Sequence, residues 1–289
     1  MNTLDRMAAV IKERGDNVFD MALWQKGERS AHIITRTAPC QNCYSVTKSF
    51  TSIAVGIAQD RGLLSVDDPI LKYLRGELPG KYDEKLERVT IKHLLTQTMG
   101  NEKGYLFEGD RYTHGSDDFL YIVLSAHLKY EPGTRFCYSN STYYLLSCIV
   151  RRASGMMLDE FARQNIFVPL GVKDYAWTTC PKGETSGATG LYLPTGDLLK
   201  FGVMLMNKGI YEGRRVVSEE YIAEATKNHI TFEEKGNYGY SFVPVEGGFT
   251  ACGAYNQQII VLPDKGIVFA AHAFMENINY YELLMDALD

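Results

Sequence analysis

The sequence predicts an α+β fold, in which strands from both ends of the chain form one antiparallel sheet. Strand-like runs follow the first helical pattern and return near the end of the chain. Helical patterns open and close the chain, and the middle holds only short helical patterns broken by Gly and Pro. We therefore expect terminal helices to flank the sheet and an all-helical region to be inserted between its strands.

The chain opens with a helix and a hairpin. Residues 3–14 carry apolar side chains at helical spacing, and Gly15 follows as a C-terminal stop. Two β-rich runs come next, at residues 18–24 and 31–36. The turn-like residues 25–29 between them suit antiparallel pairing, so we expect a hairpin.

The clearest helical pattern begins at Ser45. Apolar residues recur there at helical spacing, and they are Val46, Phe50, Ile53, Ala54 and Ile57. Gly62 closes the pattern, at a position where a left-handed cap costs little.

Shorter elements fill the remainder of the chain. Helical patterns span residues 90–97, 117–127 and 142–153, strand patterns span residues 239–245, 248–251, 257–262 and 266–272, and a closing helix spans residues 276–288. This order predicts two domains. Residues 1–60 with 171–289 form an α/β domain that holds the sheet, and residues 61–170 form an inserted helical domain that carries Tyr138.

The composition is that of a globular protein, with 45% hydrophobic residues, 22% charged residues and a formal net charge of -5. A chain with this charge has no broad positive field, so we expect no nucleic acid as a partner. No apolar run is long enough to span a bilayer, so we expect no membrane, and we interpret the first residues as a helix rather than a signal peptide. The prediction is a cytoplasmic protein whose partner is a small-molecule substrate.

The cysteines and histidines predict neither a metal site nor a cofactor. Six cysteines in a chain that is not small suit free thiols better than a disulfide framework. Cys40 and Cys43 form a single C-x-x-C without a second pair at zinc spacing, and the six histidines are scattered. Cys43, Cys137 and Cys252 each neighbour a motif described below, and we expect them to pack as small apolar residues.

A candidate nucleophile lies at the start of the clearest helix. Ser45 is the only serine followed by a lysine three residues later, in Ser45-Val46-Thr47-Lys48. This spacing places both side chains on one helix face, and the helix N-terminus favours a developing negative charge. A lysine takes a serine proton only if its pKa falls toward roughly 7 to 8, so Lys48 must be partly buried. The alternative is an ordinary helix start with a solvated lysine.

A second short motif, Tyr138-Ser139-Asn140, comes just before the helical pattern at residues 142–153. A tyrosine placed beside a nucleophile can transfer protons. Short motifs also arise by chance, and the alternative interpretation is a helix N-cap region with Tyr138 in a core.

The order of the motifs resembles that of a known superfamily. Ser-x-x-Lys, then Tyr-x-Asn, then Ala251-Cys252-Gly253 on a late strand resemble the serine β-lactamases and penicillin-binding proteins, especially their class C-like and esterase branch. Further segments resemble that branch in the same order, at residues 43–52, 61–70, 90–100, 131–134, 189–191 and 197–202. The resemblance implies the same architecture that the element order predicts.

The resemblance also implies a role for each matched residue. Ser45 would be acylated, and Lys48 would accept its proton. Tyr138 would pass protons to the leaving group or activate water. Asn140 would contact the carbonyl group of the substrate.

The third motif aligns with the Lys-Thr-Gly strand of the superfamily. The alignment implies that the oxyanion hole consists of the backbone N–H groups of Ser45 and Ala254, with Cys252 and Gly253 beside the substrate. The chain departs from the superfamily here, because Ala251 replaces a lysine or histidine and Cys252 replaces a threonine or serine. These residues offer no positive charge and no strong donor, so recognition of a substrate carboxylate should be weak.

A second departure is at Gln97 and Met99, which stand where histidine and serine are usual and which we expect to be structural. Arg111 or Arg135 could replace the missing cation, and the aromatic residues in 104–113 could line a pocket or simply pack.

The predicted function is a serine hydrolase that acts through an acyl-enzyme on a small ester, amide or lactam. The departures in the third motif favour an esterase or amidase with weak β-lactamase activity. The alternatives are a true β-lactamase or D-alanyl carboxypeptidase, or a catalytically silent binding domain of the same fold.

Overall fold

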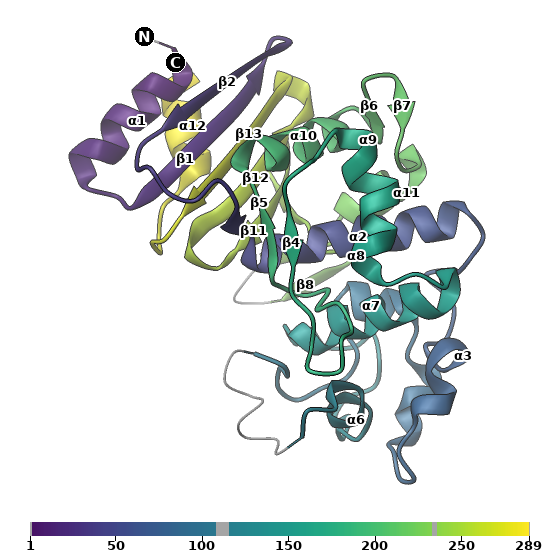
Figure 1. The fold of residues 1–289 in the computed structure, drawn as a ribbon. Helices are drawn as coiled ribbons and strands as arrows, with labels where there is room; N and C mark the ends of the chain where they lie inside the picture. Colours follow the sequence, from purple (N-terminus) through teal and green to yellow (C-terminus); the bar gives the residue numbers. More distant parts are fainter. Residues whose placement is uncertain (1, 108–115, 233–235, 289) are drawn as a thin grey trace.

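The computed structural model describes residues 2–107, 116–232 and 236–288 (Figure 1). β1 (Val18–Gln25) and β2 (Glu28–Ile33) come from the start of the chain, and β10 (Val243–Val245), β11 (Gly248–Gly253), β12 (Gln257–Leu262) and β13 (Ile267–Ala273) come from its end. They form one six-stranded sheet in the order β10-β11-β12-β13-β1-β2. Every neighbouring pair is antiparallel, so the predicted α+β fold is confirmed.

Helices cover both faces of this sheet. β13 is buried along its whole length, as a central strand with a layer on each side must be. α1 (Thr3–Arg14) and α12 (Tyr280–Leu288) lie side by side on one face (Figure 1). α10 (Thr195–Met206) covers the other face, and Gly202 allows the close approach, because a Cβ atom there would lie 2.4 Å from Val268 Cγ1.

A buried helix connects the sheet with the helical part of the molecule. α2 (Thr47–Asp60) packs against α7 (Asn140–Ser154) and α8 (Leu158–Ala162). From the same helix, Phe50 stacks on Phe201 of α10 with ring centroids 3.9 Å apart. A helix with core neighbours around its circumference is held firmly, so the backbone that follows Ser45 is rigid.

Short elements complete the described fold. The further helices are α3 (Leu71–Leu74), α4 (Ile91–Leu95), α6 (Phe119–Leu124), α9 (Val168–Leu170) and α11 (Glu219–Thr226). Small sheets join β3 (Gln41–Asn42), β5 (Leu191–Leu193) and β4 (Ala176–Trp177), then β6 (Ile210–Tyr211) and β7 (Arg214–Arg215), then β8 (Ile230–Phe232) and β9 (Gly236–Tyr238). The division into domains at residues 60 and 170 stays a prediction.

The strand predicted over residues 239–245 is wrong in its first half. Gly239 lies against the end of α11, where a Cβ atom would be 2.3 Å from the Ala225 carbonyl oxygen. Ser241 has a φ of 68°, in the left-handed region that interrupts a strand. Only the end of the predicted run therefore pairs, as β10.

Two predicted boundaries also move. The turn predicted at residues 25–29 consists only of Lys26 and Gly27, whose φ values of 53° and 84° suit a two-residue type I′ turn, so β2 begins earlier than predicted. The closing helix begins at Tyr280 rather than at residue 276, after Asn277 with its φ of 69°.

Candidate active site

A pocket of about 1020 Å³ opens where the end of β11, the start of α2, the start of α7 and residues 178–190 meet. Its lining includes six of the predicted site residues, namely Ser45, Tyr138, Asn140, Cys252, Gly253 and Ala254. The remaining predicted residue, Lys48, is fully buried and contacts Ser45. The fold thus brings all of them together from distant parts of the chain.

The candidate nucleophile is presented by a tight turn. Ser45 lies in the 3₁₀ turn Tyr44–Val46, which leads into α2. Tyr44 has a φ of 44°, which a tyrosine seldom adopts. Its N–H donates to Asn42 Oδ1 at 2.9 Å, and Asn42 pairs with Tyr192 of β5. Because such backbone strain persists only where the surroundings fix it, the position of Ser45 is well determined.

Three acceptors surround the Lys48 amino group. Its Nζ atom lies 3.1 Å from Ser45 Oγ, 2.7 Å from Asn140 Oδ1 and 2.9 Å from the Ala188 carbonyl oxygen. None of these partners is a carboxylate. Burial therefore disfavours the charged form and lowers the pKa of Lys48 to about 7. The alternative of a solvated lysine is wrong.

The same partners also suit the neutral amine. A neutral amine has two N–H donors and one lone pair. Asn140 Oδ1 and the Ala188 carbonyl oxygen can accept the two N–H groups, and the lone pair then faces the Ser45 hydroxyl. A proton can pass from the hydroxyl to the amine without leaving a buried group unpaired.

Tyr138 faces the same two groups. Its ring centroid lies 4.9 Å from Lys48 Nζ. Burial raises the pKa of Tyr138 to about 12, although a hydrogen bond with Ser45 lowers it in part. The side chain is half-buried and lines the pocket, so it does not lie in an ordinary core. With this pKa the phenol keeps its proton at neutral pH.

Asn140 is engaged at both ends of its side-chain amide. Its Oδ1 atom accepts from Lys48, and its Nδ2 atom donates to the Leu106 carbonyl oxygen at 3.0 Å. The residue begins α7, whose N-cap Ser139 accepts from the Ser141 N–H. Asn140 therefore orients Lys48, and its contact with a substrate carbonyl stays a prediction.

Gln97 holds the Tyr138-Ser139-Asn140 segment in place. It is fully buried, with a φ of 60°. Its Oε1 atom accepts from the Ser139 N–H at 3.1 Å and from Thr142 Oγ1 at 2.7 Å, and its Nε2 atom donates to the Ser139 carbonyl oxygen at 3.1 Å. The expectation that this position is structural agrees with these contacts.

The end of β11 lies directly beside the nucleophile. A Cβ atom on Gly253 would be 2.6 Å from the Cys43 carbonyl oxygen and 3.2 Å from the Ser45 nitrogen. Only glycine therefore allows β11 to approach the turn that carries Ser45. Ala254, the next residue, lines the pocket, and the role of its N–H in the oxyanion hole stays a prediction.

One expectation about the cysteines is wrong. All six are free thiols. Cys43 is buried and Cys137 is partly buried, but Cys252 is exposed and lines the pocket. Successive side chains of a strand point to opposite faces, so the buried Ala251 turns the next side chain toward the pocket.

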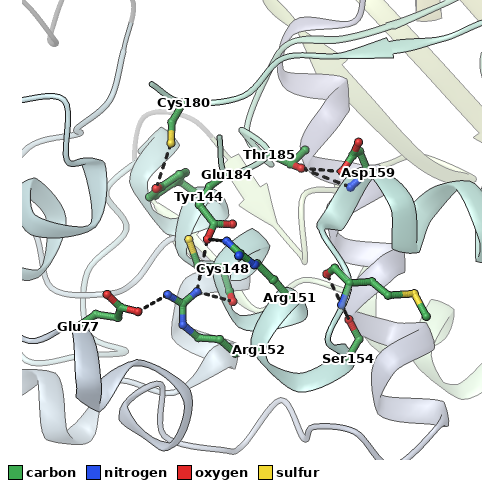
Figure 2. Close-up of polar contacts among 11 residues, drawn as sticks. Glu77, Tyr144, Cys148, Arg151, Arg152, Ser154, Asp159, Cys180, Glu184 and Thr185 are labelled. Carbon is green, nitrogen blue, oxygen red and sulfur yellow. Dashed lines mark hydrogen bonds and ion pairs between the residues drawn. The ribbon is translucent and has the colours of Figure 1, made fainter. Parts of the chain in front are cut away.

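Residues 178–190, which we call the wall segment, form another side of the pocket. Figure 2 shows how Glu184 of this segment meets Arg151 and Arg152 of α7. Arg152 Nη1 lies 3.8 Å from Glu184 Oε1, and its Nη2 atom is 2.5 Å from Glu77 Oε1. The Glu184 side chain is only 8% exposed, so these ion pairs compensate a nearly buried charge.

Glu184 was not predicted from the sequence, and neither were Gln257 and His272, which lie behind the end of β11. Gln257 donates to the Ala254 carbonyl oxygen at 3.1 Å, and its Oε1 atom lies 2.7 Å from His272 Nδ1. Burial lowers the pKa of His272 to about 4, so its ring is neutral at pH 7. These residues belong to no short motif, and only the paired strands bring them together.

The described lining of the pocket carries no charged side chain. Phe107 from the predicted aromatic loop is part of it, and its ring stacks against Tyr138 with centroids 6.5 Å apart. Arg135 is exposed, is not part of the lining, and contacts the Tyr130 ring at 4.8 Å. The other candidate cation, Arg111, lies outside the described residues.

The described residues hold neither a metal-binding cluster nor a membrane-spanning helix. Residues 2–107, 116–232 and 236–288 contain no group of three or more His, Cys, Asp or Glu side chains arranged to hold a metal ion. Within the same ranges, no helix combines the length and the apolar character needed to cross a membrane.

Comparison with known proteins places the chain in a family. Residues 24–275 match the family described as Beta-lactamase.

Penicillin-binding protein 4* of Bacillus subtilis (strain 168) is 30% identical over 136 residues, which cover 45% of this chain but 29% of that longer protein. The octameric penicillin-binding protein homologue from Pyrococcus abyssi is 21% identical, with 100% of this chain and 77% of that chain covered and a TM-score of 0.78. The D-stereospecific amidohydrolase from Streptomyces sp. is 17% identical, with 99% of this chain and 98% of that chain covered and a TM-score of 0.73. At such identities, the solved structures establish a shared fold. The family match covers most of the chain, and the chain therefore belongs to the Beta-lactamase family.

Proposed function

We propose that this chain is a serine hydrolase that forms an acyl-enzyme at Ser45 and acts on small neutral esters or amides, with weak β-lactamase activity. One observation carries the proposal. Lys48 Nζ lies 3.1 Å from Ser45 Oγ, and burial lowers the pKa of Lys48 to about 7. A lysine that is half neutral at physiological pH can act as a general base.

In the proposed acylation step, Ser45 Oγ attacks the substrate carbonyl carbon while its proton passes to Lys48 Nζ. The resulting oxyanion accepts hydrogen bonds from the backbone N–H groups of Ser45 and Ala254. Tyr138, which is protonated at neutral pH, donates to the leaving alcohol or amine and recovers a proton from Lys48. The carbonyl–oxygen or carbonyl–nitrogen bond breaks, and the acyl group remains on Ser45.

Deacylation reverses this proton path. Water attacks the acyl carbonyl carbon and gives a proton to the base. The bond from the carbonyl carbon to Ser45 Oγ then breaks as the base returns that proton to Ser45 Oγ, and the acid product leaves. The base is the neutral amine of Lys48, because Lys48 gives its proton to Tyr138 at the end of acylation. No charged partner beside Lys48 opposes its return to the neutral form.

The described lining of the pocket, which carries no charged side chain, supports the choice of substrate. At the end of β11, a carboxylate on the substrate would find neither a lysine nor a hydroxyl donor, because Ala251 is buried and Cys252 presents a thiol. A hydrogen bond to a charged group contributes roughly 1.5 to 3 kcal/mol, so one or two missing bonds should lower kcat/KM by about one to three decades. Neutral esters lose nothing from this change, since the oxyanion donors are backbone groups.

The test compares kcat/KM for p-nitrophenyl butyrate and for nitrocefin with the same enzyme preparation. We expect the ester value to be higher by about one to three decades. The Ser45→Ala variant is the control for hydrolysis that does not use the site. A nitrocefin value equal to or above the ester value would contradict the substrate assignment, and Arg111→Ala and Arg135→Ala would then identify the cation responsible.

A further inference from the structure

The turn that connects β11 to β12 has an unfavourable backbone conformation. Within this oxyanion turn, residues 253–256, Tyr255 has φ and ψ of 58° and 28°, and Asn256 has a φ of 62°. Two consecutive non-glycine residues in the left-handed region are unfavourable, because the Cβ atom of each crowds a backbone carbonyl oxygen. Such a conformation persists only where surrounding contacts determine it.

The Gln257 side chain provides the contacts nearest to Ala254. Its Nε2 atom donates to the carbonyl oxygens of Ala254 at 3.1 Å, Tyr255 at 3.2 Å and Ala273 at 2.7 Å. Gln257 is only 2% exposed, so water does not replace these bonds. The amide therefore ties the oxyanion turn to the neighbouring strand β13.

The opposite end of the same side chain connects with the nucleophile side of the pocket. Gln257 Oε1 lies 2.7 Å from His272 Nδ1, and His272 Nε2 lies 3.1 Å from the Leu193 carbonyl oxygen. Leu193 belongs to β5 and pairs with Gln41 of β3, which precedes the turn carrying Ser45. The neutral His272 ring has one N–H and donates to only one of these two oxygens at a time, so it links the two backbone segments through one hydrogen bond and one packing contact.

Other contacts hold the outer part of the turn and do not reach Ala254. Asn256 Nδ2 donates to the Met275 carbonyl oxygen at 2.8 Å, and the Tyr255 ring stacks on Phe274 with centroids 4.3 Å apart. The Ala254 carbonyl oxygen is held by Gln257. The carbonyl and the N–H of Ala254 belong to adjacent peptide planes, so holding the carbonyl restricts the φ and ψ angles of Ala254 and, through them, the direction of its N–H group.

We propose that Gln257, supported by His272, is a positioning residue that aims the Ala254 N–H into the oxyanion hole. This inference rests on the proposed function, because it assigns Gln257 to the acylation step at Ser45. Gln257 does not touch the reacting atoms; it acts through the oxyanion turn. A displacement of about 1 Å in such a donor is enough to lower a rate about 100-fold.

The direct test replaces Gln257 with Met, which keeps the length of the side chain and removes both polar atoms. We expect kcat for p-nitrophenyl butyrate to fall by roughly 10- to 100-fold with KM changed less than about threefold, because the oxyanion exists only in the transition state. The pH midpoint of acylation should not move, because Lys48 is unaffected. Gln258→Met is the matched control. Its side chain contacts Thr250 and Cys252 rather than the oxyanion turn, and activity should stay within about threefold of wild type.

A tetrahedral probe separates positioning from a general structural effect. With phenylboronic acid, Ser45 Oγ adds to the trigonal boron, its proton passes to Lys48, and one boronate oxygen takes the place of the oxyanion. Affinity for this probe should fall in Gln257→Met by the same factor as kcat. If Gln257→Met does not fold, the same two measurements are made on Gln257→Asn. This variant keeps the amide but shortens the side chain by one methylene group.

Two results would overturn the inference. In one, a folded Gln257 variant retains kcat and boronate affinity within threefold of wild type. In the other, the loss lies in KM alone. Failure of the proposed function itself is distinguishable, because wild-type protein would then form no adduct at Ser45 with a fluorophosphonate.

Discussion

The Lys48 amino nitrogen lies 3.1 Å from the Ser45 hydroxyl oxygen, and its two other partners are the uncharged oxygens of Asn140 and Ala188. A carboxylate in either place would keep the lysine charged and unable to accept a proton. Burial alone acts on this group and lowers the pKa of Lys48 to about 7. The pair can therefore exchange a proton near neutral pH, and this property sets most of the expected behaviour of the site.

The pH dependence of acylation follows from this value. Because the neutral amine is the base, the acylation rate should be low at pH 5.5, rise with pH through a midpoint near 7 and level off above pH 8. Single-turnover release of p-nitrophenol from a neutral ester measures this rate without interference from deacylation. A rate that is flat from pH 6 to 9, after correction for the Ser45→Ala background, would exclude Lys48 as the base.

Tyr138→Phe keeps the aromatic ring and removes only the hydroxyl group. We expect kcat to fall by roughly 10²- to 10⁴-fold, the usual size of a general acid–base contribution, while the melting temperature barely moves. Because the pKa of Tyr138 is raised to about 12, its hydroxyl stays protonated from pH 6 to 9. Ionisation of Tyr138 should therefore cause no fall in the kcat of the wild-type enzyme in this pH range.

The control for Tyr138 is Tyr192→Phe, which removes a different tyrosine hydroxyl from the pocket lining. Its effect on kcat should be less than about tenfold, because no catalytic proton transfer is lost. Full ester hydrolysis by Tyr138→Phe would show that Tyr138 only packs.

Glu184→Gln tests the wall segment through the titration of Lys48. Without the ion pairs to Arg151 and Arg152, the segment should loosen, and water should reach the Lys48 amino group. Hydration relieves the burial that lowers the pKa of Lys48, so the midpoint of acylation should move upward by about one pH unit, and the rate at pH 7 should fall about fivefold.

Among the described residues, the groups that face Lys48 are uncharged in this pH range, namely Ser45, Asn140, Ala188, Tyr138 and Tyr143. No other titration should therefore obscure the shift. Glu160→Gln, which removes an exposed ion pair with Arg163, should leave the midpoint in place. An identical midpoint in Glu184→Gln would show that the wall segment does not control the lysine.

Periodic patterns made the fold predictable. The strands predicted at residues 257–262 and 266–272 agree with β12 and β13 to within one residue, because alternating or continuous apolar runs report burial directly. The errors occurred at residues with a positive φ, such as Ser241 and Asn277. Tertiary contacts impose a left-handed backbone conformation there, which the sequence pattern does not indicate.

The candidate site was predictable only in part. Ser45 and Lys48 are three positions apart on one helix, so their contact is a local property. The Ala188 carbonyl oxygen carries no sequence signal at all, since every residue has one. The positions of Gln257 and Cys252 depend on which face of a paired strand each residue occupies, and that requires the register of the sheet.

The central claim is that Ser45 is the nucleophile, and the most direct test is intact mass after incubation with a fluorophosphonate at pH 8. The Ser45 oxygen displaces fluoride from phosphorus, so wild-type protein should gain the mass of one phosphonyl group. Folded Ser45→Ala should gain none under the same conditions. An equal adduct on Ser45→Ala, or no adduct on wild-type protein at any pH from 6 to 9, would contradict the account.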